Sequence, residues 1–258
     1  MQADLTNDDP ETAISWVYSF TPGHADGDVA DKDFLGGKGA NLAEMCRSNL
    51  PVPPGFTIRS NAGAAYEANG KRLPDELKAQ IRAALAQLEE RTGKALGDTC
   101  SPLLVSVRSG ARVSMPGMMD TILNLGMNDA TTQALADASG NPWYAYDTLR
   151  RFITMYGSVV QGVDHSLFED IVDAAIERED AGVVQDLSVD AMKQIVEEFK
   201  DAMQDEYEVT FPQDPYEQLW NAIEAVFKSW NSPRAVVYRA AHSIPDDWGT
   251  AVNIQSMV

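Results

Sequence analysis

The alternation of hydrophobic and polar positions divides the chain into a mixed part, a helical part and a short return to the mixed pattern. In the first part, three short apolar runs have the composition of β-strands, at residues 16–20, 56–58 and 103–107. Proline, glycine and one long helical pattern over about 75–92 separate them. Strands that alternate with helices in this way predict a mixed α/β fold.

The middle of the chain, from about residue 128 to 213, has no strand-like runs. Its apolar residues recur at helical spacing and are broken by short polar segments, which predicts a series of helices. Asp164, Ser166 and Ser188 are candidate N-terminal caps or near-caps. The expected helices cover about 142–162, 166–180 and 188–208.

After this stretch the pattern becomes mixed again. An amphipathic helix is expected at about 215–230, followed by a shorter helix at 233–241. Pro233 suits the first turn of that second helix, with Asn231 or Ser232 as its cap. Strict alternation over 251–258 then predicts a strand.

The net charge of −19 is concentrated in the helical stretch. Residues 1–127 carry 12 basic and 16 acidic side chains, residues 128–213 carry 5 and 18, and residues 214–258 carry 3 and 5. Together with the change of pattern, this predicts a helical insertion at 128–213 between a first lobe and a return to that lobe. A solvated face explains the acidity, and a docking surface for a basic partner is the alternative.

Composition also limits the function classes. The 44% hydrophobic content suffices for a core, and the acidic excess argues against nucleic acid as a general partner. No apolar stretch is long enough to span a membrane, and an acidic opening with Asp4, Asp8, Asp9 and Glu11 does not resemble an export signal. Two cysteines far apart in sequence, Cys46 and Cys100, fit a reducing cytoplasm.

Residues 35–45 combine a glycine turn with the start of a helix. Such a junction offers backbone N–H groups and the positive end of the helix dipole to a phosphate, and Lys38 adds a full charge. Gly36 and Gly37 form the turn. The spacing is not that of a Walker A loop, and an ordinary glycine turn with a surface lysine is the alternative.

Residues 104–121 predict a buried strand that runs into a loop rich in glycine, serine and methionine. Arg108 lies at the strand end, where a guanidinium can bind phosphate oxygens, and Arg112 follows four residues later. Gly117 allows close approach of a ligand or movement over it. The three methionines of this loop would ordinarily be core residues, but beside two arginines they favour a functional lid: Met115, Met118 and Met119.

The segment 227–239 contains two further arginines, Arg234 and Arg239. They are five positions apart, so a helix need not turn both toward one ligand, and packing or salt bridging is expected for at least one of them. The isolated histidines His24, His165 and His242 show no catalytic pattern.

Several segments in collinear order resemble the N-terminal part of the pyruvate, phosphate dikinase family. They are GGKGANLAEM, LPVPPGFTI, SVRSGARVSMPGMMDTILNLG, LRRFITMYG, VFKSWNSPRAVVYR and DWGTAVNIQSMV. The loop SMPGMMD is the most specific of them. Phosphoenolpyruvate synthase shares the GGKGANL, the PPGF and the Arg-Ser strand end, but it usually continues into an acidic, alanine-rich loop.

The resemblance implies an α+β fold with an ATP-grasp-like nucleotide-binding domain. It implies ATP with Mg²⁺, transfer of the β-phosphoryl group of ATP to a histidine on a separate swivelling domain, and consumption of phosphate and pyruvate. Lys38 matches a phosphate-contacting lysine, Arg108 matches an arginine that binds the ATP phosphates, and 117–119 match a mobile loop over the nucleotide. Five further residues are candidates for supporting the phosphate site: Gly36, Gly37, Arg112, Arg234 and Arg239.

The resemblance also implies that the chain is a fragment. On this basis the acidic Mg²⁺ ligands, the phosphorylated histidine and the C-terminal barrel belong beyond Val258, so no catalytic or metal-binding residue is expected in residues 1–258. The domain division is then first lobe 1–127, acidic insertion 128–213, and a return at 214–258 that includes the first strand of a truncated second lobe. Weak ATP binding and no turnover are expected of the chain alone, with a homodimer for the complete enzyme. The alternatives are a phosphoenolpyruvate synthase-type dikinase and a truncated, non-catalytic nucleotide-binding or regulatory module.

Overall fold

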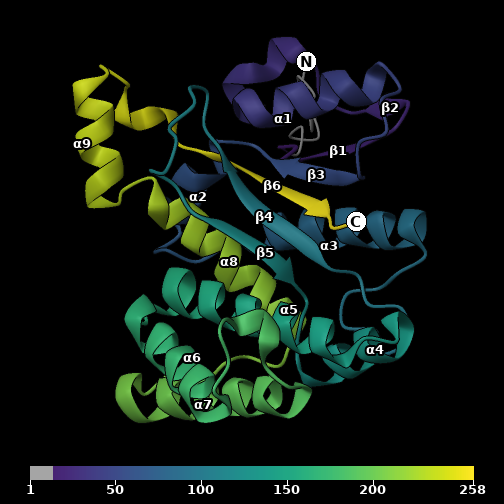
Figure 1. Cartoon of the computed structure of the whole chain (residues 1–258). Coiled ribbons are helices and arrows are strands. Elements are labelled where there is room, and N and C mark those ends of the chain that lie inside the picture. Colours follow the sequence, from purple (N-terminus) through teal and green to yellow (C-terminus); the bar gives the residue numbers. More distant parts are fainter. Residues whose placement is uncertain (1–13) are drawn as a thin grey trace, which may run out of the picture.

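A computed structural model describes residues 14–258, and within them one antiparallel sheet of six strands forms the centre of the fold (Figure 1). The strand order is β2-β1-β3-β6-β4-β5, and every pairing is antiparallel. The strands are β1 Val17–Thr21, β2 His24–Ala25, β3 Gly55–Ile58, β4 Val105–Gly110, β5 Thr121–Leu125 and β6 Ala251–Ser256. The predicted mixed α/β class is therefore confirmed.

The two faces of the sheet are covered by different helices. Val252 and Ile254 of β6 point into the main apolar core, which includes residues of α3 Asp75–Thr92 and α8 Pro215–Ser229. On the other face α1, Lys32–Arg47, packs across β6, β1 and β4 (Figure 1). Thr57 and Asn253 are joined there by a buried hydrogen bond of 2.9 Å. The alternation predicted for the last strand thus separates an apolar face from a polar one.

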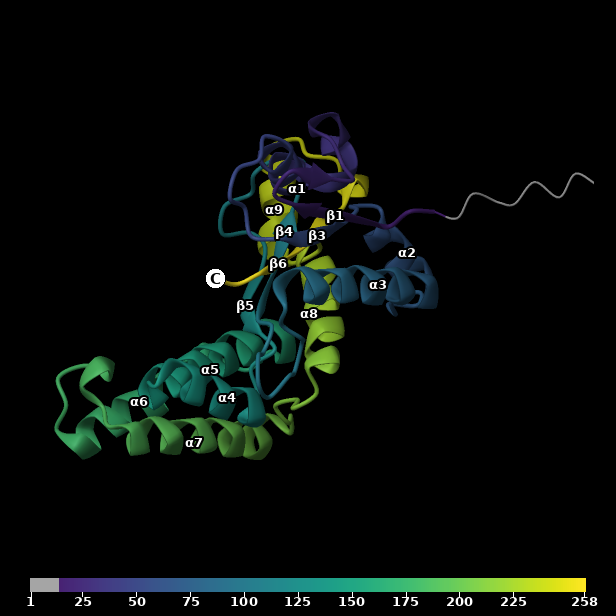
Figure 2. The same ribbon diagram turned by 90° about the vertical axis from the view of Figure 1, so that its right-hand side faces the viewer.

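Four helices occupy the middle of the chain and lie together beside the sheet (Figure 2). They are α4 Asp129–Ser139, α5 Pro142–Tyr156, α6 His165–Glu179 and α7 Val189–Tyr207. A π-helical turn, Gly157–Gln161, follows α5 within the range expected to be helical. The apolar core runs without interruption from the sheet into these helices through Phe152, Phe168 and Phe199.

The predicted helix caps of this part have different outcomes. Asp164 caps α6 and Ser188 caps α7, as predicted. Ser166 is a near-cap: it lies in the first turn of α6, and its backbone N–H and its hydroxyl both donate to the carboxylate of Asp164 at 3.0 Å. The sequence patterns also gave no indication of α4.

The remaining helices follow the predictions at the C-terminal side. α8 matches the expected amphipathic helix, and α9, Pro233–Ala241, begins with Pro233 and is capped by Ser232. The short helix α2, Ala62–Ala68, and strand β5 were not predicted.

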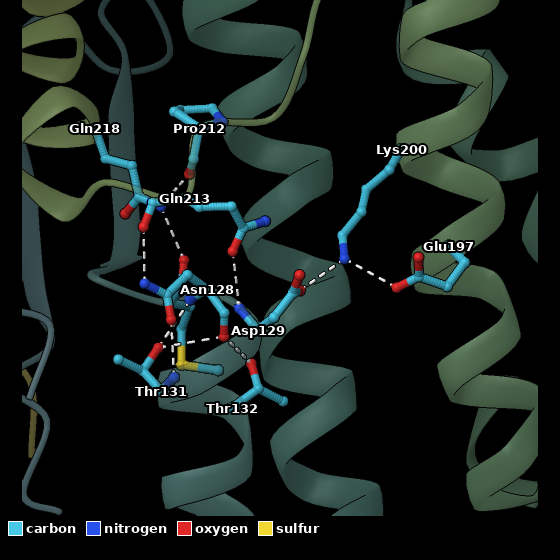
Figure 3. A network of polar contacts seen from close by, with 10 residues as sticks. Asn128, Asp129, Thr131, Thr132, Glu197, Lys200, Pro212, Gln213 and Gln218 are labelled. Carbon is cyan, nitrogen blue, oxygen red and sulfur yellow. Dashed lines mark hydrogen bonds and ion pairs between the residues drawn. The ribbon is translucent and has the colours of Figure 1, made fainter. Parts of the chain in front are cut away.

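A network of polar contacts joins the helical part to the sheet (Figure 3). The fully buried Gln218 of α8 accepts from the N–H of Gly126 at 3.1 Å and donates to the carbonyls of Met127 and Pro212 at 2.9 and 2.8 Å. Asn128 caps α4 and donates to the carbonyl of Gln213 at 2.8 Å. These hydrogen bonds connect the segment between β5 and α4 to α8 and the segment that leads into it.

None of the helices within residues 14–258 combines the length and the hydropathy that a bilayer crossing requires. The acidic opening segment with Asp4, Asp8, Asp9 and Glu11 lies outside the described residues.

Candidate functional site

A cavity of about 590 Å³ lies where the start of α1 meets the end of β4 and the loop of residues 111–120. In Figure 1 this loop lies between α1 and α9. Three cationic side chains, Lys32, Lys38 and Arg112, contribute to its lining. Among the described residues no carboxylate does so, which makes the lining suited to an anion.

Gly36 positions Lys38 at this cavity. Helix α1 is interrupted at Gly36, whose φ of 67° and ψ of 173° are not helical. A Cβ at this position would lie 1.6 Å from the carbonyl oxygen of Gly110, so only glycine allows the helix to approach the strand end this closely. The N–H of Gly37 donates to the carbonyl of Ala111 at 2.9 Å and is therefore not free for a ligand, contrary to the expectation for the glycine turn.

Lys38 and Arg108 are two half-buried cations that lie near each other. The Nζ of Lys38 donates to the carbonyl of Ser109 at 2.7 Å. Burial, and then the positive charge of Arg108, lower the pKa of Lys38 below its ordinary value. Burial likewise lowers the pKa of Arg108, and its Nη2 donates to Oε1 of Gln255. An anion beside them would relieve this unfavourable arrangement.

Arg108 differs from Lys38 in its relation to the cavity. It is not among the lining residues, and its Nε is buried without a hydrogen-bond partner in the described part of the chain. A buried N–H of this kind is costly unless a further partner binds, so Arg108 retains donor capacity for a ligand.

Arg112 lines the cavity from the start of the loop. Its guanidinium lies 4.9 Å from the ring centroid of Trp248, and its Nη1 is 3.4 Å from Oδ1 of Asp33. Trp248 belongs to the turn Asp246–Trp248 that precedes β6, so this stacking connects the loop to the last strand.

The methionine loop is partly a lining element and partly a packed one. The N–H of Met118 donates to the carbonyl of Met115 at 3.1 Å, and Gly117 has a φ of 73°, as a turn with glycine in its third position requires. Gly117 and Met119 line the cavity, whereas Met118 does not. Met115 is buried against Trp230 and Ala235, so one end of the predicted lid is anchored in an apolar cluster.

Arg234 fixes the other end of this loop. Its Nε donates to the carbonyl of Met118 at 3.1 Å, and its Nη2 pairs with Asp120. Burial raises the pKa of Asp120, while the paired Arg234 acts in the opposite direction. Arg234 therefore contacts the loop and not the cavity.

Arg239 is placed away from the cavity. It is only 2% exposed, stacks on Trp230 at 4.3 Å, and bonds to the carboxylate of Asp246 at 2.8 Å. These contacts hold α9 to the turn before β6. They agree with the prediction that at least one of Arg234 and Arg239 serves packing or salt bridging.

The structure thus brings together six of the expected residues at the cavity wall: Gly37, Lys38, Arg112, Met115, Gly117 and Met119. Lys32, Asn41 and Thr121 also line it and were missed. Lys32 could have been found, because it precedes the glycine pair by only a few residues, just as Lys38 follows it.

Comparison with known proteins defines the family. The family model for the pyruvate phosphate dikinase AMP/ATP-binding domain matches residues 68–258, which is most of the chain. The chain therefore belongs to the family of pyruvate phosphate dikinase AMP/ATP-binding domains.

Curated relatives share this assignment. The chain is 51% identical over 245 residues to "Pyruvate, phosphate dikinase" of Rhizobium meliloti (strain 1021), which covers 94% of the chain and 27% of the relative. It is 51% identical over 247 residues to the enzyme of the same name from Clostridium symbiosum, with 94% and 28% covered. It is also 47% identical over 252 residues to "Pyruvate, phosphate dikinase 1, chloroplastic" of Arabidopsis thaliana, with 97% and 26% covered. The chain spans about a quarter of the length of these relatives.

The described residues do not form a site for Mg²⁺. A hard divalent cation takes oxygen ligands, usually carboxylates. No carboxylate from residues 14–258 lines the cavity, and no group of three metal-binding side chains occurs in that part of the chain.

Proposed function

We propose that the cavity between α1, β4 and the methionine loop binds the phosphate groups of ATP, and that the chain is the ATP-binding part of a pyruvate, phosphate dikinase. The observation that carries this proposal is the pair of half-buried cations, Lys38 and Arg108, which have no carboxylate partner among residues 14–258. A polyphosphate would supply the missing negative charge.

The residues at the cavity would have separate roles. Lys38 would place its ammonium on a phosphate oxygen, and Arg108 would donate from a guanidinium whose Nε is unpartnered. Gly117 and Met119 would cover the nucleotide, with Arg234 holding their loop. Phosphoryl transfer depends mainly on positioning and charge stabilisation in a site that excludes water, and these roles supply both.

We propose an ATP-grasp-like arrangement for the fold. Residues 1–127 would form the first lobe, 128–213 the helical insertion, and 214–258 the return to that lobe and the first strand of a second. The compact group α4–α7 and the concentration of acidic residues there support this division.

The reaction proposed for the whole enzyme uses ATP and phosphate to convert pyruvate into phosphoenolpyruvate. The chain would deliver the β-phosphoryl group of ATP, as its Mg²⁺ complex, to a histidine on another domain, and a C-terminal barrel would act on pyruvate. Two observations support this reaction. The chain belongs to the dikinase family, and it matches only about a quarter of the length of each relative. We also propose a homodimer in the cytoplasm, and the two free cysteines, Cys46 and Cys100, suit a reducing compartment.

The test of the ATP role is Arg108→Ala in a protein that carries the remaining dikinase domains. We expect the variant to lose ATP-dependent phosphorylation of the histidine, because one buried guanidinium is removed from the phosphate site. Arg178→Ala is a matched control, since Arg178 is paired with Glu198 far from the cavity, in the helical part. Normal phosphoenzyme formation by the Arg108 variant would contradict the proposal.

Calorimetry of the 258-residue chain separates this proposal from a stand-alone nucleotide-binding module. A first lobe alone presents only part of the ligand contacts, so we expect ATP to bind weakly. Micromolar affinity without further domains would favour the module instead.

A further inference from the structure

The four arginines expected at the phosphate site, Arg108, Arg112, Arg234 and Arg239, differ in the hydrogen bonds that their guanidinium groups make. Arg108 donates to Gln255, Arg234 to the carbonyl of Met118 and Arg239 to the carbonyl of Trp230. Arg112 makes no such hydrogen bond to any described residue, and its Nε is buried without a partner. Since a guanidinium has five N–H donors, most of the donor capacity of Arg112 is unused.

The Arg112 guanidinium is nevertheless held in place by an aromatic ring. Its central carbon lies over the Trp248 ring, 4.9 Å from the ring centroid, in a cation–π contact. A cation–π contact leaves N–H donors of the group available, so its N–H edge can exchange one anionic partner for another while the contact with Trp248 persists.

The present anionic partner of that edge is weakly held. Asp33 lies 3.4 Å from Nη1 of Arg112, longer than the roughly 2.7–2.9 Å of a strong charge-assisted hydrogen bond. The Asp33 side chain is 71% exposed, against 26% for Arg112. It immediately follows Lys32, which lines the cavity.

We propose that Asp33 is a placeholder for the nucleotide: its carboxylate holds Arg112 when no phosphate is bound, and a phosphate group displaces it on binding. Trp248 acts as a positioning residue that keeps the guanidinium at the cavity wall throughout. This inference rests on the proposed function. Asp33 then weakens binding of every phosphate ligand and selects for ligands with several charges, because a polyphosphate competes with the carboxylate better than a single phosphate does.

The central test is Asp33→Asn, a change at an exposed side chain that preserves its shape. Removing a competing exposed ion pair should tighten binding of ATP and of inorganic tripolyphosphate by about two- to five-fold. Glu44→Gln is the matched control, because it removes one exposed charge from the same helix at a distance where salt screens the effect. We expect it to change the affinity far less.

The NMR signal of the Arg112 Nε–Hε group, identified by its loss in Arg112→Lys, reports the exchange directly. It should shift during titration with tripolyphosphate in the wild type and saturate at lower ligand concentration in Asp33→Asn. In Trp248→Leu we expect a weaker affinity for tripolyphosphate and a smaller shift of the Arg112 signal, because the ring that orients the Arg112 guanidinium is missing.

Two results would overturn this inference alone: ATP binding that depends on Lys38 but is equal or weaker in Asp33→Asn, or an Arg112 signal that stays unmoved at saturation. If neither ATP nor tripolyphosphate binds any variant at millimolar concentration, the proposed function fails as well.

Discussion

The cations of the helical part and the two half-buried cations Lys38 and Arg108 differ in whether a carboxylate accompanies them. The five arginines and lysines of residues 128–213 all form ion pairs, and their partners include Asp147, Glu198 and Asp129. These five basic residues are Arg150, Arg151, Arg178, Lys193 and Lys200. Lys38, which lines the cavity, and the neighbouring Arg108, which does not, are half-buried and have no carboxylate partner within residues 14–258. Arg112, also in the lining, is paired with the exposed Asp33.

This contrast indicates where a ligand's charge is needed. An unpaired lysine on the surface is ordinary, but a half-buried one loses hydration without an ionic partner in return. The sequence has a large excess of carboxylates, and yet none of those within residues 14–258 pairs with these two cations. We infer that the paired cations serve stability, whereas the unpaired ones serve the phosphate binding proposed for this site.

Breaking the central pairing of the helical part should have the largest effect. Asp147, whose side chain is 9% exposed, accepts from Arg150 and Arg151 at 2.7 Å each. Asp147→Ala should lower the free energy of unfolding by about 2–3 kcal/mol, because Arg150 is left mostly buried without an anion. Chemical denaturation measures this loss.

The matched control for that change is Asp190→Ala. The Asp190 carboxylate, which pairs with Lys193, is 94% exposed, so its loss should lower the free energy of unfolding by less than about 0.5 kcal/mol. ATP affinity should be the same in both variants. Equal stability losses, or a loss of ATP binding in the Asp147 variant alone, would show that these ion pairs do not serve mainly the stability of the helical part.

Removing an unpaired cation should have the opposite effect: ATP affinity should fall while folding stability does not. Lys38→Met should weaken ATP binding by about tenfold or more, because one charge-assisted hydrogen bond to phosphate is worth about 1.5–3 kcal/mol. Its folding stability should be unchanged or higher, since the buried charge disappears. Titration calorimetry and denaturation together measure the two effects, with Lys193→Met as the control for a paired lysine. A Lys38 variant that loses stability and keeps its ATP affinity would reverse the comparison.

The sequence predicted those parts of the fold that local signals specify. The helix at 75–92 was predicted with its observed bounds, because acidic residues occupy its first turn and Gly93 ends it in the left-handed conformation. Helix α4 was missed although Asn128 and Thr131 form a capping box, because its threonine- and alanine-rich sequence gives a weak apolar stripe. Strand β5 was missed because Asn124, at a φ of 58°, interrupts its alternation.

The candidate site was predictable to the extent that its residues are close in sequence. The glycine turn with Lys38 and the loop with Arg112, Gly117 and Met119 were each recognised, and the fold places them at one cavity. The stacking of Trp248 on Arg112 could not be predicted, because it depends on how α9 and β6 return to the loop in three dimensions. The burial of Arg239 depends on the same packing.

The smallest expected effect is a pH dependence that belongs to the unpaired cations. Burial and the charge of Arg108 lower the pKa of Lys38 from its ordinary 10.5. A lysine whose pKa is lower in the folded state holds its proton less tightly there, so its burial cost is fully present below the lowered pKa. This cost disappears as the pH rises toward 10.5, and the contribution of Lys38 to stability becomes more favourable through that window.

A bound polyphosphate reverses this shift, because the negative charge stabilises the ammonium. ATP affinity should therefore fall as the pH rises through the same window. The measurement is the difference in unfolding free energy and in ATP affinity between the wild type and Lys38→Met, from about pH 7 to about pH 11. The difference in stability should move in favour of the wild type with increasing pH, while its advantage in ATP affinity shrinks. A difference that stays flat across this range would mean that the charge of Lys38 is no more costly to bury than that of the paired lysines.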